Sequence, residues 1–323
     1  MDILRAGDRA IAADGGLAGL IEPLDSESFL RERLGRKPFV VRGSAGRFGD
    51  LLGWEDLNAI LGSTRVDLGR MHLAGGAGTR SLLSCAEPVP QLAPRGTPLR
   101  LAPDRLQAAL AEGATLVVDG IEELHAPLRR LVAAVEKSLR CLVQANLYAN
   151  LGGARQGFGT HWDDHDVLIL QIEGAKHWEI HRPTMDFPVG VISEPPLPEP
   201  GTAHWSGELA DGDVLYLPRG WWHRVSATDE VSAHLTVSAR LPSAGDLLRR
   251  LMTRAAGEYA EIRQDLPRFA GPEDAGRWYA ALREVLVKAV DTPGLLEQLA
   301  GELDTGAPAR PVFALPDACP AGR

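Results

Sequence analysis

The sequence predicts an α+β fold, with helices and strands in its first part, a succession of strands in its middle and helices at its end. Between residues 141 and 241, runs of apolar and β-branched residues alternate with Gly and Pro, which is typical of strands joined by turns. After Pro242 the pattern changes, because apolar residues recur at helical spacing. The chain has 323 residues and 45% apolar content, which is enough for one large domain or two.

The first part of the chain is expected to start with a partly ordered lead-in, residues 1–19, which shows no clear period. Asp25 or Ser26 can cap a short helix that ends at Gly35. The elements expected next are a strand at 38–41, a helix at 54–61, a loop with short strands at 74–98, a helix capped by Asp104 and closed by Gly113, a strand at 115–119, a helix at 125–139 and a strand from Cys141. Helices are expected again at 244–259, 272–290 and 293–303, before a tail rich in Pro and Ala.

Charge and cysteine content narrow the class of protein. The chain has 34 Lys and Arg against 43 Asp and Glu, a formal net charge of −9, which repels nucleic acid and favours a basic protein or peptide as partner. Cys85, Cys141 and Cys319 are too few and too widely spaced for a disulfide framework or a cysteine zinc site. The sequence shows neither a signal peptide nor a long apolar segment. We therefore expect a cytoplasmic protein without a membrane anchor.

A His-x-Asp pair and a distant histidine form the candidate metal site. In an extended segment His161 and Asp163 share one face, about 6.6 Å apart along the backbone. His223 follows a strand-like run that Pro218 and Gly220 interrupt. Two histidines and one carboxylate make the facial triad that leaves positions open on non-haem Fe(II) for a co-substrate and O2. A fourth candidate, His165, would lie about 13 Å from His161 along such a strand, too far for the same ion.

Lys176 is expected to point into the fold. Glu173-Gly174 separates two apolar runs and predicts a tight hairpin that pairs Gln171 with Lys176. A lysine inside a closed sheet needs an anionic partner, which a dicarboxylate would supply. The alternative is that Lys176 reaches the rim of the sheet and remains solvated.

The last predicted strand, 234–241, alternates strictly between polar and apolar residues. Its polar face carries His234, Thr236, Ser238 and Arg240, and inside a barrel such a face implies a wet, functional interior. On an ordinary sandwich it would face solvent, so the roles of His234 and Arg240 stay open. The proline-rich segment 183–200 predicts a connecting loop.

These motifs together resemble the JmjC family of Fe(II)/2-oxoglutarate oxygenases. The resemblance rests on His161-Trp-Asp163, on Lys176 fifteen residues after His161, and on Pro218-Arg-Gly-Trp-Trp-His223. It is strongest to the ribosomal-oxygenase branch, through Ala145-Asn-Leu-Tyr148, Gln156-Gly-Phe158 and Leu170-Gln-Ile-Glu-Gly-Ala-Lys-His-Trp178. The family implies a double-stranded β-helix, a cupin-like jelly roll, with N-terminal helices and strands and a C-terminal helical segment.

The resemblance also implies roles and boundaries. It assigns His161, Asp163 and His223 to iron, Lys176 to the far carboxylate of 2-oxoglutarate, and Asn146 and Ser238 to the co-substrate pocket. It implies a catalytic domain at 20–242 and a helical segment at 243–305 that mediates homodimerisation. The composition of 306–323 predicts a flexible tail, and the about 80 residues after the barrel predict a truncated or absent winged helix. The expected substrate is a protein or peptide, such as a ribosomal protein. The alternatives are a small metabolite or biosynthetic peptide as substrate, or a cupin-like binding protein without activity, whereas histone demethylation is disfavoured because no reader module is visible.

Overall fold

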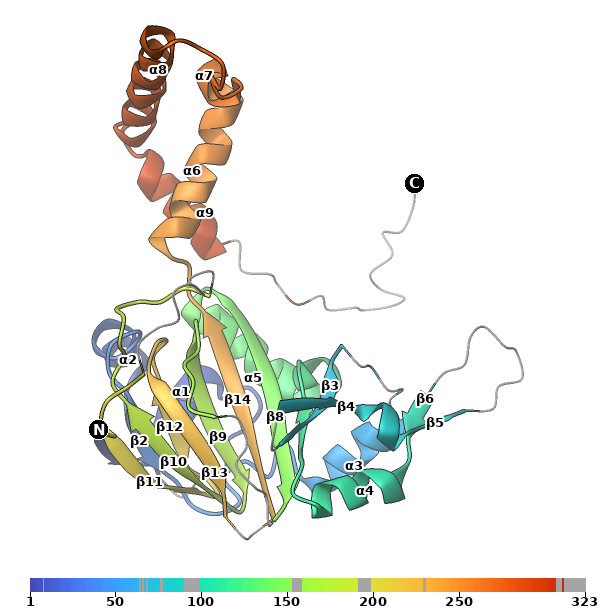
Figure 1. Ribbon diagram of the computed structural model, residues 1–323. Coiled ribbons are helices and arrows are strands. Elements are labelled where there is room, and N and C mark those ends of the chain that lie inside the picture. The colour runs from blue at the N-terminus through green and yellow to red at the C-terminus, as the bar shows by residue number, and fades with distance from the viewer. Residues whose placement is uncertain are drawn as a thin grey trace, which may run out of the picture. The chain divides into compact units, whose positions relative to one another are not determined.

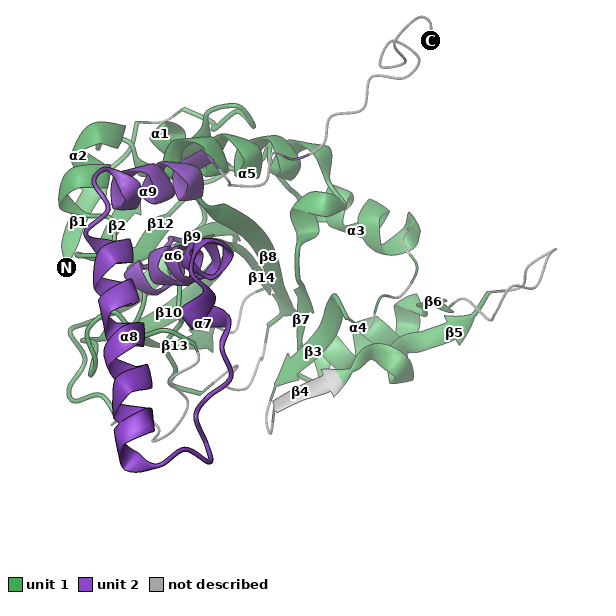
Figure 2. Ribbon diagram, turned by 90° about the horizontal axis from the view of Figure 1, so that it is seen from above, with its two compact units in different colours: residues 1–240 green, residues 241–323 purple. Residues whose placement is uncertain are grey.

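A computed structural model describes residues 1–7, 9–63, 65, 67, 69–75, 78–89, 99–152, 159–190, 199–228, 231–305 and 310. The chain divides into two compact units, Met1–Arg240 and Leu241–Arg323 (Figure 2). Except for Arg310, the tail predicted at 306–323 lies outside the described residues, as do the motif 156–158 and the central part of the 183–200 loop. No helix in the described ranges is both long and apolar enough to cross a membrane.

Two facing sheets form the centre of the first unit and confirm the predicted jelly-roll class (Figure 1). The larger sheet has nine strands, in the spatial order β1 (Asp2–Arg5), β2 (Phe39–Arg42), β12 (Val214–Leu217), β9 (Asp166–Glu173), β14 (Val231–Arg240), β8 (Leu142–Leu151), β7 (Thr115–Val118), β3 (Met71–Gly75) and β4 (Gly78–Ser81). The smaller sheet has the order β11 (Trp205–Ala210), β10 (Ala175–His181) and β13 (Trp222–Ala227). A separate pair is formed by β5 (Ala86–Pro88) and β6 (Leu99–Leu101).

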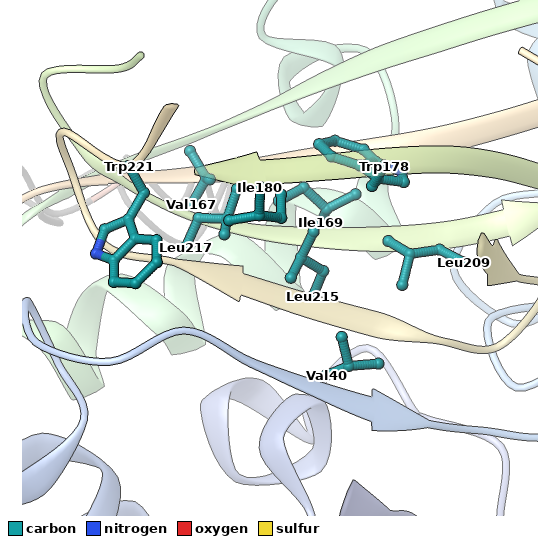
Figure 3. Close-up of a cluster of buried hydrophobic side chains, with 9 residues drawn as sticks. All are labelled: Val40, Val167, Ile169, Trp178, Ile180, Leu209, Leu215, Leu217 and Trp221. Carbon is teal, nitrogen blue, oxygen red and sulfur yellow. The ribbon is translucent and has the colours of Figure 1, made fainter. Parts of the chain in front are cut away.

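The core between the two sheets is apolar at one end. Figure 3 shows side chains from both sheets meeting in this cluster, which contains Val40, Val167, Ile169, Trp178, Ile180, Leu209, Leu215, Leu217 and Trp221. All nine side chains are buried. Burial of such side chains stabilises a fold by about 1.5–3 kcal/mol each, so this cluster holds the smaller sheet on the larger one.

The first unit also contains helices. They are α1 (Gly16–Ile21), α2 (Ser26–Glu32), α3 (Trp54–Ser63), α4 (Pro103–Ala111) and α5 (Ala126–Leu139), with short 3-10 turns at Leu82–Cys85 and Ile121–Glu123. Helix α5 contacts β8, where Val143, Ala145 and Leu147 are fully buried. Because side chains alternate along a strand, Asn146 and Tyr148 face the other way, into a cavity between the sheets.

The second unit is helical, as the periodicity after Pro242 predicts. It contains α6 (Ala244–Glu258), α7 (Ala260–Arg263), α8 (Pro272–Val290) and α9 (Leu295–Thr305). Ser243 accepts a hydrogen bond from the backbone N–H of Asp246, whose carboxylate accepts one from the Ser243 N–H in return. This reciprocal cap fixes the start of α6. Leu251, Ala255, Ala289, Leu295 and Leu299 form the small core of the unit.

Two local predictions about the first part of the chain are wrong. The lead-in 1–19 contains β1, which pairs in parallel with β2, and α1. Strand β1 is a short edge strand with mostly exposed side chains, so it leaves no hydrophobic period in the sequence. Helix α4 starts with Pro103 after Ala102, and Asp104 makes no cap but lies in the first turn, where its charge suits the helix dipole.

The predicted hairpin at Glu173-Gly174 is also wrong. Strand β9 pairs with β12 and β14, while β10 pairs with β11 and β13, so the chain passes from one sheet to the other at this point. Gly174 has φ +62°, and a Cβ there would lie 2.1 Å from the carbonyl oxygen of Val231. A tight turn was therefore correctly located, but local sequence does not reveal that both edges of β9 are already occupied.

Candidate metal centre

Two remote segments of the chain are paired at His161 and His223. The His161 N–H donates to the His223 carbonyl at 3.0 Å, and the His223 N–H donates to the His161 carbonyl at 2.7 Å. This antiparallel bridge extends the smaller sheet beyond β13 and brings the two imidazole rings to a centroid distance of 4.2 Å. The Gly220 N–H, in the bend before β13, donates to the Asp163 carbonyl at 2.9 Å, which ties the carboxylate-bearing residue to the same place.

The hydrogen bonds of both rings set their tautomers. Nδ1 of His161 is 2.8 Å from the Gly159 carbonyl, and Nδ1 of His223 is 3.2 Å from the Trp221 carbonyl. Because a carbonyl oxygen only accepts, each Nδ1 carries the proton, and each Nε2 keeps its lone pair. Backbone carbonyls orient metal-binding histidines in this way in many proteins.

The three ligand atoms converge. One ligand atom each of His161, Asp163 and His223 lies within 4.8 Å of the other two, and Nε2 of His223 is 3.6 Å from Oδ2 of Asp163. Burial, reinforced by the neighbouring His161 ring, lowers the pKa of His223 to about 4. His223 is therefore neutral at pH 7, which is the form that binds a metal ion.

His165 is held apart from this group. Its Nδ1 is 2.9 Å from Oδ1 of Asp164, and Nη2 of Arg240 is 3.8 Å from the other oxygen of that carboxylate. The carboxylate of Asp164 therefore links His165 to Arg240, whose side chain is largely exposed. This arrangement agrees with the sequence argument that leaves His165 out of the metal site.

A cavity of about 160 Å³ opens beside the three ligands. All six residues singled out in the sequence lie in its wall: Asn146, His161, Asp163, Lys176, His223 and Ser238. They come from β8, β10, β13, β14 and the segment before β9. The space is sufficient for on the order of ten water molecules, or for a small diacid.

Lys176 points into this cavity from β10 and is buried, with 3% of its surface exposed. This excludes the alternative in which it reaches the rim. Its Nζ lies 3.0 Å from Nδ1 of His234 and 3.5 Å from the Tyr148 carbonyl, and no carboxylate of a described residue shifts its pKa. Burial lowers the pKa of Lys176 to about 7. The ammonium group is thus available for an anion that enters the cavity.

Asn146 and Ser238 lie in the cavity wall on neighbouring strands. Oδ1 of Asn146 accepts from the Gly120 N–H at 3.0 Å and from Nε2 of Gln144 at 3.1 Å, which fixes the orientation of the amide. Ser238 lies on β14 opposite Gln144. The remaining polar wall residues on β8 and β14 are Tyr148, Thr236 and His234.

The sequence alone leaves the role of His234 open and assigns no role to Tyr148. The strict alternation of 234–241 is the signal that places His234, Thr236 and Ser238 on one face, and the structure shows this face turned to the cavity. Arg240 shares the parity but lies at the end of β14, where its side chain is exposed. The polar face is therefore interior along most of β14 and exposed at the end of the strand.

The geometry agrees with the family comparison, in which residues 122–247 match the JmjC domain. The matched segment includes all three candidate ligands. Among solved structures, the Escherichia coli ribosomal oxygenase YcfD, in complex with cobalt and 2-oxoglutarate, has a TM-score of 0.56 and 19% sequence identity, and the match covers 91% of this chain and 74% of that one. At this identity the match shows a shared fold.

The curated relatives carry related names. The "bifunctional lysine-specific demethylase and histidyl-hydroxylase NO66" of Drosophila pseudoobscura pseudoobscura is 30% identical over 78% of this chain and 26% of the relative. The protein of the same name in Dictyostelium discoideum is 31% identical over 82% of this chain and 51% of the relative. "Ribosomal oxygenase 1" of Gallus gallus is 31% identical over 77% of this chain and 41% of the relative. The chain spans about a quarter to a half of the length of these relatives.

Proposed function

We propose that this chain is an Fe(II)- and 2-oxoglutarate-dependent oxygenase that hydroxylates a side chain of a protein or peptide. The observation that carries the proposal is the convergence of His161, Asp163 and His223 on one point in the wall of a cavity that also contains a buried lysine. Two imidazoles whose Nδ1 atoms are protonated and one carboxylate fit the donor set of a facial Fe(II) site.

Each residue has a distinct task in this proposal. His161, Asp163 and His223 would hold the iron, which would also bind the co-substrate and O2. The Lys176 ammonium would receive the far carboxylate of 2-oxoglutarate, and Asn146 and Ser238 would line its pocket. Fe(II), 2-oxoglutarate and O2 together supply the oxidation, in which one oxygen atom enters a C–H bond of the substrate and 2-oxoglutarate becomes succinate and CO2. The chain binds and orients the reactants and excludes water, and no side chain needs to act as a general base.

The substrate is best sought among basic proteins. The relatives are named for histidyl hydroxylation and for the ribosome, so a histidine side chain of a ribosomal protein is the first candidate. The net charge of −9 favours encounter with a basic partner and disfavours direct binding of nucleic acid.

Two further expectations belong to the same proposal. One is a cytoplasmic location, for which the low cysteine content is the support. The other is a homodimer formed through the helical segment 243–305, where the large apolar side chains of Leu266, Phe269 and Tyr279 are 66%, 95% and 60% exposed. Light scattering of the purified chain tests the dimer.

The decisive experiment is incubation of the chain with Fe(II), 2-oxoglutarate and a mixture of ribosomal proteins. The proteins are then digested, and the peptides are analysed by mass spectrometry. The expected result is a peptide heavier by one oxygen atom, formed only when 2-oxoglutarate is present and absent with Asp163→Ala. Succinate formation that depends on a small molecule instead would favour a metabolite or biosynthetic-peptide hydroxylase. Failure to bind 2-oxoglutarate at millimolar concentration would favour a cupin-like binding protein without activity.

A further inference from the structure

His234 forms a buried contact that the proposed chemistry does not use. Its Nδ1 lies 3.0 Å from Nζ of Lys176, although the two residues belong to opposite sheets and are 58 positions apart in the chain. Both side chains are buried, with 5% and 3% of their surfaces exposed. The contact therefore spans the interior between β14 and β10, in the wall of the candidate co-substrate cavity.

The imidazole of His234 is held rigidly. Its ring stacks on Tyr148 with a centroid distance of 4.8 Å and an interplanar angle of 6°, and Trp178 packs against it edge-on at 5.7 Å. The backbone of His234 also pairs with Tyr148 on β8 and with Gln171 on β9. A ring fixed on two sides by aromatic side chains offers a hydrogen-bonding atom at a defined position.

The chemistry of the pair defines which atom donates. An ammonium group has only donors, so Nδ1 of His234 must accept, and the ring proton is then on Nε2. Burial, followed by the nearby charge of Lys176, lowers the pKa of His234 well below its usual value, so the ring stays neutral. Below the Lys176 pKa of about 7, the pair as a whole thus carries one positive charge. A carboxylate at position 234 would hold Lys176 as well but would cancel that charge.

We propose that His234 is a positioning residue, which aims the Lys176 ammonium into the cavity while leaving its charge for the far carboxylate of the co-substrate. The inference rests on the proposed function, because it deepens the role of Lys176 there. The hydrogen-bond partner of Lys176 must then be a neutral acceptor, so neither an apolar residue nor an acidic one can replace His234.

Three substitutions separate this role from simple packing. His234→Phe keeps the aromatic stacking and removes the acceptor, His234→Asn keeps a neutral acceptor near the position of Nδ1, and His234→Asp supplies a charged one. The matched control is His177→Phe, which changes a histidine of β10 that is hydrogen-bonded to Ser206 near the surface. Each protein is loaded with Mn(II), and calorimetry measures 2-oxoglutarate binding, while thermal melting measures the fold.

We expect the dissociation constant for 2-oxoglutarate to rise from the wild type through His234→Asn and His234→Phe to His234→Asp. Loss of a hydrogen bond to a charged group predicts a rise of about tenfold or more for His234→Phe. His234→Asp should melt at least as high as His234→Phe and yet bind the co-substrate worst, a combination that a purely structural role does not give. Equal 2-oxoglutarate affinities for the wild type, His234→Phe and His234→Asp would overturn the inference. It would also be overturned if His234→Asn bound 2-oxoglutarate as weakly as His234→Phe does. If the wild-type protein itself binds no 2-oxoglutarate, the proposed function fails instead.

Discussion

Replacing Lys176 by Met should make the first unit more stable and abolish its response to 2-oxoglutarate. Burial lowers the pKa of Lys176 from 10.5 to about 7, a change of about 3.5 pKa units. At 1.36 kcal/mol per unit, a buried ammonium costs the fold up to about 5 kcal/mol below pH 7. Methionine has a similar length and no charge, although it leaves His234 without its donor, so we expect a net gain of about 2 kcal/mol.

Thermal melting at pH 7 tests this expectation. A gain of about 2 kcal/mol corresponds to a rise of roughly 4–8 °C for a unit of this size. With Mn(II) present and 2-oxoglutarate at about 100 times its dissociation constant, the wild-type protein should become more stable by about 2.7 kcal/mol, whereas Lys176→Met should not respond. The wild type should then melt at a higher temperature than Lys176→Met. The control is Lys137→Met, which changes an exposed lysine of α5 and should alter neither value. If Lys176→Met is less stable than the wild type without ligand, the buried ammonium does not destabilise the fold. If 2-oxoglutarate stabilises Lys176→Met as much as the wild type, the ammonium does not bind the co-substrate.

Three further predictions follow from the same geometry. Asp163→Ala should reduce Mn(II) affinity at least tenfold, as measured by calorimetry, because it removes the only carboxylate of the ligand group, and unchanged affinity would exclude the site. Since 2-oxoglutarate needs the ammonium form of Lys176, its affinity for the metal-loaded protein should be flat below pH 7 and fall by about tenfold per pH unit above it, with proton uptake seen as a buffer-dependent binding enthalpy. A flat affinity up to pH 9 would contradict this. Gly174→Ala should lower the unfolding free energy by more than about 2 kcal/mol in denaturant titration, because its methyl group would meet the Val231 carbonyl; a loss below 0.5 kcal/mol would show that the turn can relax.

Local sequence patterns were sufficient for most elements and for the convergence on the metal site. The caps and periods around Asp25, Trp54 and residues 126–139 correspond to helices α2, α3 and α5. The His-x-Asp spacing and the bend before His223 indicated three donors, which the structure brings within 4.8 Å. These features depend on neighbours in the chain, which the sequence displays directly.

Sheet membership and cross-sheet contacts could not be read in the same way. Lys176 points inward although the predicted hairpin at Glu173-Gly174 does not exist, because β10 lies in the smaller sheet and faces the cavity from there. Its partner, His234, lies 58 residues further along on β14, and no local pattern links the two. Strands β11 and β13 were missed because they belong to a sheet whose pairing is entirely non-local. Asn146 and Ser238 were named through family resemblance rather than through any pattern of their own.

The backbone bridge between His161 and His223 has a consequence for the protein in the cell. It joins stretches 62 positions apart in the sequence, and an ion held by both imidazoles would act as a removable cross-link between them. Such a cross-link stabilises the folded form by an amount that grows with the logarithm of the ion concentration above the dissociation constant. If the proposed iron fills this site, iron starvation would shorten the lifetime of the folded polypeptide as well as stop the proposed reaction, and the amount of protein would follow the iron supply.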